Sequence, residues 1–322
     1  MSVVGAGGIG GALGAYLARA GHDVTLVYRR EEEARTVRER GLRVSGKSEF
    51  TARVDTRVWP QKVPPSDLLV AAVKTYGTRE ALRVAEGVPV GTAISVQNGL
   101  QKEDVLGEIL GPEVVLGSVV MITAAKGERG RVHHADLDRS HVGETDGTVS
   151  ERARRIAETF TRAGLPTEAV RGYRSVEWTK TCQWIATSSL SVISGYRYPL
   201  VFSTPWLQPL FVQIVRECSA VAGADGAGIV EVPGLFVHNL SGKPDGEARD
   251  WLHRAGAALE EGPMRDYRAS MLLDLEKGSP TEFEDVAGYV LAKAREHGVE
   301  TPALDTAARL VRALTASGRP AV

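Results

Sequence analysis

Cysteine is scarce in this chain, which has only Cys182 and Cys218 among its 322 residues. Two cysteines cannot build the disulfide framework of a small secreted domain, and both fall within helical patterns. The sequence passes from Met1 directly into a glycine-rich stretch without a charged leader, so we expect neither a signal peptide nor a transit peptide. These absences favour a reducing, cytoplasmic location.

An excess of charge of either sign is also missing. The 39 lysines and arginines are matched by 40 aspartates and glutamates, which leaves a net charge of −1. No basic face indicates a nucleic-acid partner, and no polybasic block indicates a membrane surface. Apolar runs stay below the ~18–20 residues that a transmembrane helix needs. We therefore expect a globular protein that binds neither nucleic acid nor membrane.

Metal-ligand spacings such as HxxxH and CxxC are absent as well. His133 and His134 are adjacent, so a strand would turn their side chains to opposite faces. Two such histidines cannot hold one ion together. We therefore predict no metal site.

The strongest positive pattern lies at the start of the chain. Gly5, Gly7 and Gly10 form a GxGxxG motif between a short β-branched strand and the helical segment "ALGAYLARAG". In a dinucleotide-binding turn, the first glycine makes the turn and the second lets a pyrophosphate approach the backbone, while the third lets helix and strand pack closely. The predicted cofactor contacts in this turn are Gly5, Ala6, Gly7, Gly8, Ile9 and Gly10.

The end of the second strand, "HDVTLVY", bears on the choice of cofactor. Proteins that bind NAD usually carry an acidic residue there, which holds the ribose 2′-hydroxyl. This chain instead has Tyr28, Arg29 and Arg30. A guanidinium can pair bidentately with a 2′-phosphate, and no carboxylate stands there to repel it. We therefore predict NADP(H) bound at Arg29, although a solvated arginine before the next helix would look the same.

Strands and helices alternate from this point to about residue 125. Two apolar strands end in polar residues, "DLLVAAVKTYG" in Lys74 and "GTAISVQNG" in Asn98. Because the carboxyl ends of parallel strands face the ligand crevice, we predict that both side chains contact cofactor or substrate, although an ordinary residue at a strand exit would look the same. The segment "VVLGSVVMITAA" is interpreted as one further strand, and residues 125–144 as an antiparallel hairpin.

The second half of the chain is helical in its periodicity. The fold class predicted is an α/β N-terminal Rossmann domain at residues 1–170, with a parallel sheet and an antiparallel extension, followed by an all-α domain at residues 171–322. One polar stretch, "NLSGKPDGEARD", is expected to be a mobile loop. In the helix "EWTKTCQWIATSSLSVISG", Lys180, Trp184 and Ser188 follow one another at four-residue steps and share a stripe.

The whole chain resembles the ketopantoate reductase (2-dehydropantoate 2-reductase) family, within the 6-phosphogluconate-dehydrogenase-like enzymes. The resemblance rests on GAGGIG, "VKTYG", "VQNG", "EWTK" and "ASMLLDLEKGSPTEFEDVAGYV", which occur in the family's order. It implies an NADP-dependent oxidoreductase with a Rossmann domain and a helical domain that hold a small 2-oxo acid between them. It also implies a possible homodimer through the helical domain.

The resemblance further implies roles for single residues. Lys180 would be the general acid, Glu282 would hold its ammonium group, Ser270 would bind a substrate carboxylate, and Asn98 would bridge cofactor and substrate. The residues alone allow other interpretations. A lone lysine on an apolar helix often only extends to water. Residues 279–282 also read as a capping box whose glutamate serves the helix N-terminus, and Ser270 could be an ordinary surface hydroxyl.

The sequence departs from the family pattern at three positions. Where the family usually presents asparagines, this chain has Trp184, Ser188 and, near the third, Ala287. A drier and bulkier pocket would cost a polar substrate ~1–3 kcal/mol for each lost partner. We therefore expect the substrate to be 2-dehydropantoate or a bulkier, more apolar analogue, in a pocket lined by Trp184 and Ser188. Alternatively, Trp184 merely fills a hydrophobic core. Reductive C–N chemistry of the opine- or imine-reductase type, and a non-catalytic NADP-binding protein, are the alternatives.

Overall fold

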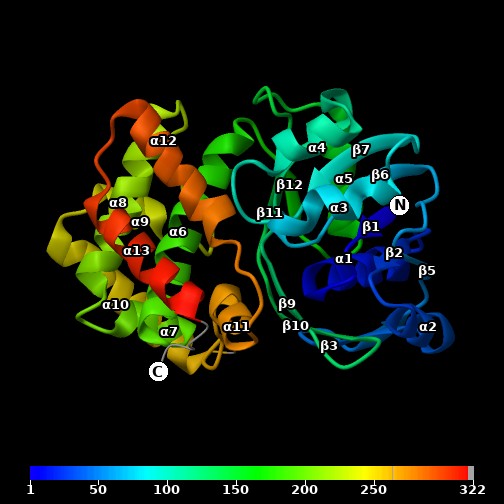
Figure 1. Cartoon of the computed structure of the whole chain (residues 1–322), viewed down its shortest axis with the longest axis horizontal. Helices are drawn as coiled ribbons and strands as arrows, with labels where there is room; N and C mark the ends of the chain where they lie inside the picture. Colours follow the sequence, from blue (N-terminus) through cyan, green and yellow to red (C-terminus); the bar gives the residue numbers. More distant parts are fainter. Residues whose placement is uncertain (263, 318–322) are drawn as a thin grey trace. The chain divides into compact units, whose positions relative to one another are not determined.

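The computed structural model of the chain describes residues 1–262 and 264–317 (Figure 1). The chain divides into two compact units, Met1–Arg174 (unit 1) and a second that begins at Ser175 (unit 2). Helix α6, Tyr173–Ser194, begins two residues before this division. The boundary predicted between residues 170 and 171 lies in the turn that precedes α6.

Unit 1 is built on a five-stranded parallel sheet, as the alternating pattern predicted. The sheet has the order β5-β2-β1-β6-β7. Its strands are Asp55–Val58 (β5), Thr25–Tyr28 (β2), Ser2–Val4 (β1), Ser66–Ala71 (β6) and Val90–Ser95 (β7). The chain order reverses at β1, which pairs with β2 on one side and β6 on the other. The carboxyl end of β1 is therefore the switch point at which such sheets bind ligands.

Helices cover both faces of this sheet. Because consecutive strand residues point to opposite faces, Val3 lies in one buried cluster and Val4 in another. The first cluster includes residues of the helices Gly8–Arg19 (α1), Glu31–Arg40 (α2) and Glu151–Arg162 (α5). The second includes residues of the short helix Leu82–Val84 (η2) and of Lys102–Leu110 (α4). Two further short helices, Thr75–Gly77 (η1) and Thr78–Ala81 (α3), precede η2.

An antiparallel extension is also present, but the prediction of one further strand just before it was wrong. The segment expected as a single strand forms two, Gly117–Val119 (β8) and Ile122–Lys126 (β9), after the short helix Pro112–Val114 (η3). They belong to different sheets, since β8 pairs with Ser140–Gly143 (β11) and β9 with Arg131–Leu137 (β10). The remaining strands are Leu42–Gly46 (β3), Phe50–Ala52 (β4) and Thr167–Ala169 (β12). Figure 1 shows β9, β10 and β3 together at one edge of unit 1.

The two adjacent histidines lie on β10. His134 is fully buried, whereas His133 is exposed, so their side chains point to opposite faces as the strand period predicted. Among residues 1–262 and 264–317, no three His, Cys, Asp or Glu side chains are grouped so that they could hold a metal ion.

The regular elements described in unit 2 are all helices. They are α6, Tyr198–Ser203 (α7), Gln208–Ala224 (α8), Val237–Gly242 (α9), Asp245–Glu261 (α10), Ser270–Glu276 (α11), the π-helical stretch Glu284–Gly288 (η4), Tyr289–His297 (α12) and Pro302–Ser317 (α13). The prediction of a mobile loop at the polar stretch "NLSGKPDGEARD" was wrong, because this stretch forms the end of α9 and the start of α10. Within the described residues, no helix has the length and apolar character needed to cross a membrane.

Candidate active site

The glycine-rich turn after β1 has the backbone geometry that its motif requires. Gly5 has φ +107°, and a Cβ there would lie 2.7 Å from the carbonyl carbon of Ala72. A Cβ at Gly10 would lie 2.1 Å from the carbonyl oxygen of Gly5, so only glycine lets α1 pack this closely. A Cβ at Gly7 would meet no atom within 4 Å. Space beside the backbone is therefore available at the position where a pyrophosphate would approach.

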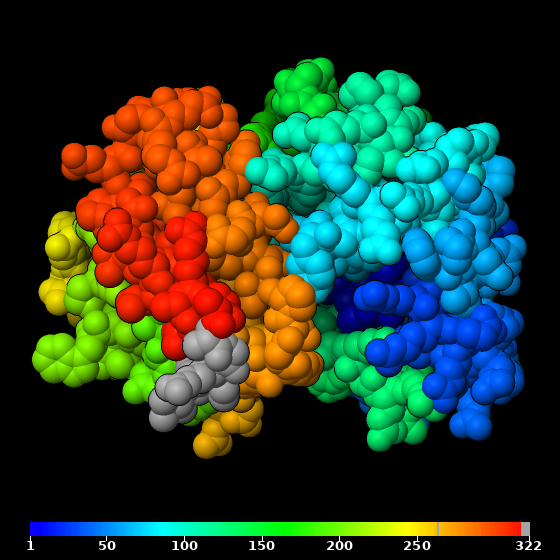
Figure 2. All heavy atoms as spheres, in the orientation of Figure 1, coloured from blue at the N-terminus to red at the C-terminus, as the bar shows by residue number. Residues whose placement is uncertain are grey.

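The amides of this turn divide into two groups. The N–H groups of Gly5 and Ala6 donate to the carbonyl oxygen of Val27, at 3.3 and 3.1 Å. Helix α1 begins at Gly8, and amides in the first turn of a helix have no acceptor within that helix. These amides and the helix dipole favour an anion there. In Figure 2, the dark-blue atoms of the N-terminal segment lie set back between cyan and green atoms of unit 1.

The end of β2 presents two exposed arginines, Arg29 and Arg30. No ion pair to either is found in the described part of the chain. Three glutamates follow in the first turn of α2, and each is paired with a basic side chain elsewhere. The pairs are Glu31 with Arg38 at 3.3 Å, Glu32 with Arg129, and Glu33 with Lys126 at 2.6 Å. The carboxylates nearest in sequence to Arg29 are thus already neutralised.

Two of these partners were not predicted from the sequence. Lys126 ends β9 and Arg129 lies in the turn before β10, more than 90 residues after the glutamates that they pair with. No local spacing reveals such a pair, because it depends on which strand folds back against α2. The β9–β10 turn is consequently fastened to the helix that follows Arg29.

Lys74 and Asn98 both lie in turns that follow neighbouring parallel strands. Lys74 comes three residues after the end of β6 and precedes η1, and Asn98 comes three residues after the end of β7. Both side chains are half-buried. Gly99 has φ +92° and makes the turn after Asn98 possible. The glycine turn, Arg29, Lys74 and Asn98 therefore all follow the carboxyl ends of one sheet.

A buried ion pair braces the segment after Asn98. The Nζ of Lys102 lies 2.9 Å from Oε1 of Glu103, and both side chains are at least 95% buried. Burial lowers the pKa of Lys102, and the adjacent carboxylate of Glu103 opposes that shift. The guanidinium of Arg174 donates to the carbonyl oxygen of Leu100 at 2.6 Å. The segment after Asn98 is therefore held in place by a buried ion pair and by a hydrogen bond from a guanidinium to its backbone.

Helix α6 carries the predicted acid on an otherwise buried surface. From residue 176 to residue 192 every residue is buried except Lys180 and Trp184, which are half-buried. These two lie on the same stripe, as their spacing predicted. Ser188, one further turn along, is 3% exposed. The stripe therefore offers an ammonium and an indole together, with a hydroxyl below them.

Ser270 and Glu282 come from other segments of unit 2. Ser270 is the first residue of α11 and is half-buried. Glu282 is 4% exposed. The capping-box interpretation was wrong, because the next helix begins at Phe283 and Glu282 precedes it instead of lying at its third position. Ala287, in place of the family's asparagine, is fully buried in η4.

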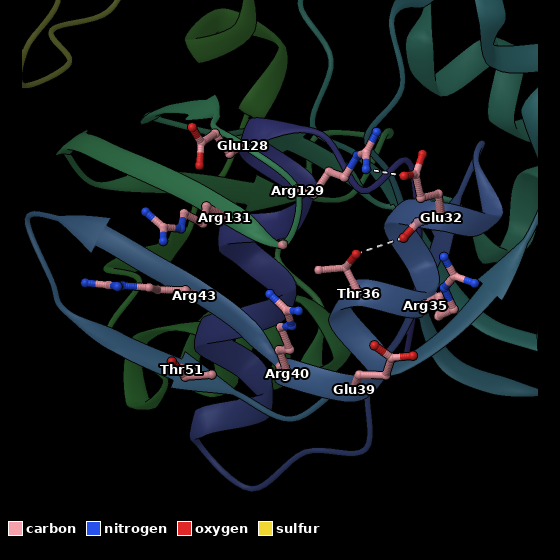
Figure 3. A pocket seen from close by; sticks show the side chains of 12 residues that line it. Glu32, Arg35, Thr36, Glu39, Arg40, Arg43, Thr51, Glu128, Arg129 and Arg131 are labelled. Carbon is pink, nitrogen blue, oxygen red and sulfur yellow. Dashed lines mark hydrogen bonds and ion pairs between the residues drawn. The ribbon is translucent and has the colours of Figure 1, made fainter.

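Unit 1 also has an open groove of about 750 Å³, which no predicted site residue lines (Figure 3). It lies among α2, β3, β4 and the β9–β10 turn, and its lining is charged. The side chains that Figure 3 labels are Glu32, Arg35, Thr36, Glu39, Arg40, Arg43, Thr51, Glu128, Arg129 and Arg131. Arg129 pairs with Glu32 and Arg43 with Glu49. The groove is an open, charged surface beside α2.

Comparison with known proteins identifies the family. A model described as "Ketopantoate reductase PanE/ApbA" matches residues 1–147, and its C-terminal counterpart matches residues 173–315. The chain belongs to the ketopantoate reductase family. It is therefore an oxidoreductase, as the resemblance implied.

Individual relatives agree over nearly the whole chain. A 2-dehydropantoate 2-reductase of Archaeoglobus fulgidus is 28% identical over 97% of this chain and 96% of its own. The 2-dehydropantoate 2-reductase of Geobacter metallireducens is 26% identical, with a TM-score of 0.83 over 97% and 99% of the two chains.

Two more distant structures share the fold. One is D-mandelate dehydrogenase with NADH and anilino(oxo)acetate, 17% identical with a TM-score of 0.81 over 98% of each chain. The other is a dimeric ketopantoate reductase from Staphylococcus aureus, 18% identical with a TM-score of 0.75 over 99% of each chain.

Proposed function

We propose that this chain is an NADPH-dependent reductase that converts the carbonyl of a 2-oxo acid to a hydroxyl group, with Lys180 as the general acid. The substrate is 2-dehydropantoate or a bulkier, more apolar analogue. The observation that carries the proposal is the position of Lys180, a half-buried ammonium on a helix that is buried on either side of it. Family membership supports the reaction class.

The cofactor half of the proposal rests on unit 1. The open backbone at Gly7 and the first-turn amides of α1 suit a pyrophosphate, so the residues present fit a dinucleotide. Arg29 would pair with the 2′-phosphate of NADPH, since the three glutamates after it are neutralised by other partners. When bound, NADPH supplies the hydride for the carbonyl carbon. Lys74 and Asn98 would hold the reactive end of the cofactor and the substrate.

The chemical half rests on the α6 stripe. As the carbonyl carbon gains hydride, its oxygen develops negative charge, and the Lys180 ammonium would donate a proton to it. Such a transfer typically contributes ~10²–10⁴-fold in rate. The positive charge would also stabilise the developing alkoxide before the proton moves. Glu282 would hold the ammonium in place, and Ser270 would donate to the substrate carboxylate.

The substrate preference rests on Trp184, Ser188 and Ala287. An indole beside Lys180 takes space and offers one N–H where an amide offers both a donor and an acceptor. Ala287, fully buried, offers no side-chain hydrogen bond at all. These residues favour a substrate whose body beyond the 2-oxo acid group is more apolar than that of 2-dehydropantoate. A related fold that was solved with anilino(oxo)acetate, which carries an aromatic ring, is compatible with this preference.

Assembly and location are further proposals. A homodimer through unit 2 is consistent with the dimeric relative from Staphylococcus aureus. Cys182 and Cys218 are both buried free thiols, which is consistent with a reducing cytoplasm. A hydrogen bond between the two thiols, together with burial, raises the pKa of Cys218, so this thiol is not suited to act as a nucleophile.

The decisive experiment is a screen of 2-oxo acids, with and without an amine, that follows the absorbance of NADPH. We expect oxidation of NADPH with the keto acid alone, and faster turnover for analogues larger and more apolar than 2-dehydropantoate. Activity only in the presence of an amine would replace this proposal by reductive C–N chemistry. Cofactor binding without turnover in any mixture would indicate a non-catalytic NADP-binding protein.

A further inference from the structure

A buried glutamine side chain joins the two turns that carry Lys74 and Asn98. Gln97 is 8% exposed, and its Nε2 donates to the carbonyl oxygen of Val73 at 2.8 Å and to Oγ1 of Thr78 at 2.6 Å. Gln97 is the residue before Asn98, and Val73 is the residue before Lys74. One amide group therefore links the immediate neighbours of both candidate residues.

The orientation of this amide is fixed by its partners. Its Oε1 accepts a hydrogen bond from Oγ of Ser95 at 2.8 Å. The hydroxyl of Thr78 donates to the carbonyl oxygen of Thr75 at 2.8 Å, so towards Gln97 it acts as an acceptor. If the amide turned over, its oxygen would face the carbonyl oxygen of Val73 and both donors would be lost. Such losses are costly inside a protein. The bridge accordingly has one stable arrangement.

The bridge also begins where the sheet stops. The last backbone hydrogen bond of this strand pair runs from the amide of Val96 to the carbonyl oxygen of Ala71 at 3.0 Å. The next hydrogen bond between the two segments, from Gln97 to Val73, comes from a side chain instead of the backbone. Ser95, which holds the Gln97 amide oxygen, is itself fixed, because it is fully buried and its carbonyl oxygen accepts from Ser118 Oγ at 2.6 Å. The side chain thereby extends the strand register into the turns.

We propose that Gln97 is a positioning residue that sets the spacing between Lys74 and Asn98. This inference rests on the proposed function, in which those two side chains contact cofactor and substrate. Gln97→Met would keep the length and the burial of the side chain and remove both donors. A displacement of about 1 Å at a reacting centre can cost up to ~10²-fold in rate. We expect Gln97→Met to lower kcat/KM roughly tenfold, a smaller share of that range.

The test compares Gln97→Met in two backgrounds with a matched glutamine in unit 2. Gln208 is 6% exposed, and its Nε2 donates to the carbonyl oxygen of Phe202 at 3.0 Å. Gln208→Met should lower Tm as Gln97→Met does and leave kcat and KM within twofold. In an Asn98→Ala background, the kinetic loss caused by Gln97→Met should nearly vanish. An equal loss in both backgrounds, or one no larger than that of Gln208→Met, would overturn the inference.

Two further measurements separate this inference from the proposed function. If Asn98→Ala alone leaves activity intact, the role of Asn98 fails whatever Gln97 does. If no 2-oxo acid is turned over, the affinity for NADPH gives an independent readout, and the effect of Gln97→Met should then depend on Lys74→Ala. Thr78→Val keeps the volume and removes the hydroxyl that accepts from Gln97 and donates to Thr75, and it should give a smaller loss with the same dependence. Additive effects throughout would overturn the positioning role.

Discussion

Units 1 and 2 present their candidate residues in different ways. In unit 1 they occupy turns after neighbouring strands of one parallel sheet, and backbone hydrogen bonds and glycine geometry fix them there. In unit 2 the predicted acid lies in the middle of a long helix. Ser270 and Glu282 come from separate segments, at the start of α11 and just before Phe283.

The difference indicates which half of the site can change without loss of the other. A phosphate bound by backbone amides needs only the turn and three glycines, whatever the other side chains are. The contacts of a substrate depend on which side chain stands at each step of a helix stripe. Trp184, Ser188 and Ala287 alter that stripe and its surroundings, while the glycine turn keeps its motif. We therefore expect cofactor binding and substrate choice to separate under mutation.

The largest expected effect is that of Lys180→Ala. Loss of the proton donor should lower kcat about 10²-fold or more and leave the Kd for NADPH nearly unchanged, since that cofactor is bound by unit 1 in this proposal. Steady-state kinetics and a fluorescence titration of NADPH measure the two. Lys277→Ala, an exposed lysine after α11, is the matched control and should be neutral. A loss in kcat below threefold would remove Lys180 as the acid.

Arg29→Asp is expected to weaken cofactor binding and to leave the chemical step unchanged, the opposite of Lys180→Ala. A carboxylate facing the 2′-phosphate removes a charge-assisted pair, which is worth ~1.5–3 kcal/mol, so the Kd for NADPH should rise roughly 10- to 100-fold. The Kd for NADH should change far less, and kcat at saturating NADPH should hold. Arg35→Asp, an exposed arginine of the groove on α2, serves as control. Equal weakening of both cofactors would contradict the preference for NADPH.

A smaller effect is expected from Trp184→Asn, which restores an amide to the stripe. Because one hydrogen bond contributes about 1 kcal/mol, kcat/KM for 2-dehydropantoate should improve by about fivefold, and that for bulkier analogues should fall. Trp206→Asn makes the same change at a side chain that is 90% exposed and should alter neither. No gain from Trp184→Asn would mean that other residues set the substrate.

The sequence predicted those features whose physical signal is local. The parallel sheet follows from apolar strands that alternate with helices, the glycine turn from the GxGxxG spacing and the Lys180 stripe from four-residue steps, and the structure has all three. Features that depend on distant partners were missed or wrong. The break between β8 and β9 exists because the two halves pair with different strands. The Gln97 bridge joins residues that only the strand order brings together, and the polar segment at residues 239–250 forms the end of α9 and the start of α10.

The comparison between the units extends to pH. His134 of unit 1 is fully buried, with Tyr16 Oη 2.8 Å from its Nδ1 and the carbonyl oxygen of Asp136 3.1 Å from its Nε2. Nε2 faces a carbonyl oxygen and donates to it, and Tyr16 Oη, beside Nδ1, also lies 2.8 Å from Oγ of Ser48. Burial lowers the pKa of His134, and the same cause lowers that of His141.

The direction of the pH effect follows from these lowered pKa values. An unfolded histidine binds a proton below about pH 6.5, before the folded one does. The contribution of these histidines to the free energy of unfolding of unit 1 should therefore be complete above pH 6.5. It should be lost as the pH falls from there towards the folded pKa. Hydrogen-exchange protection factors of α1 and β10 amides at pH 7.5 and 5.5 measure this loss. His134→Gln should reduce it, and His133→Gln, at the exposed neighbour, should not. An equal loss of protection in α6 and α8 over that range would show that the effect is not confined to unit 1.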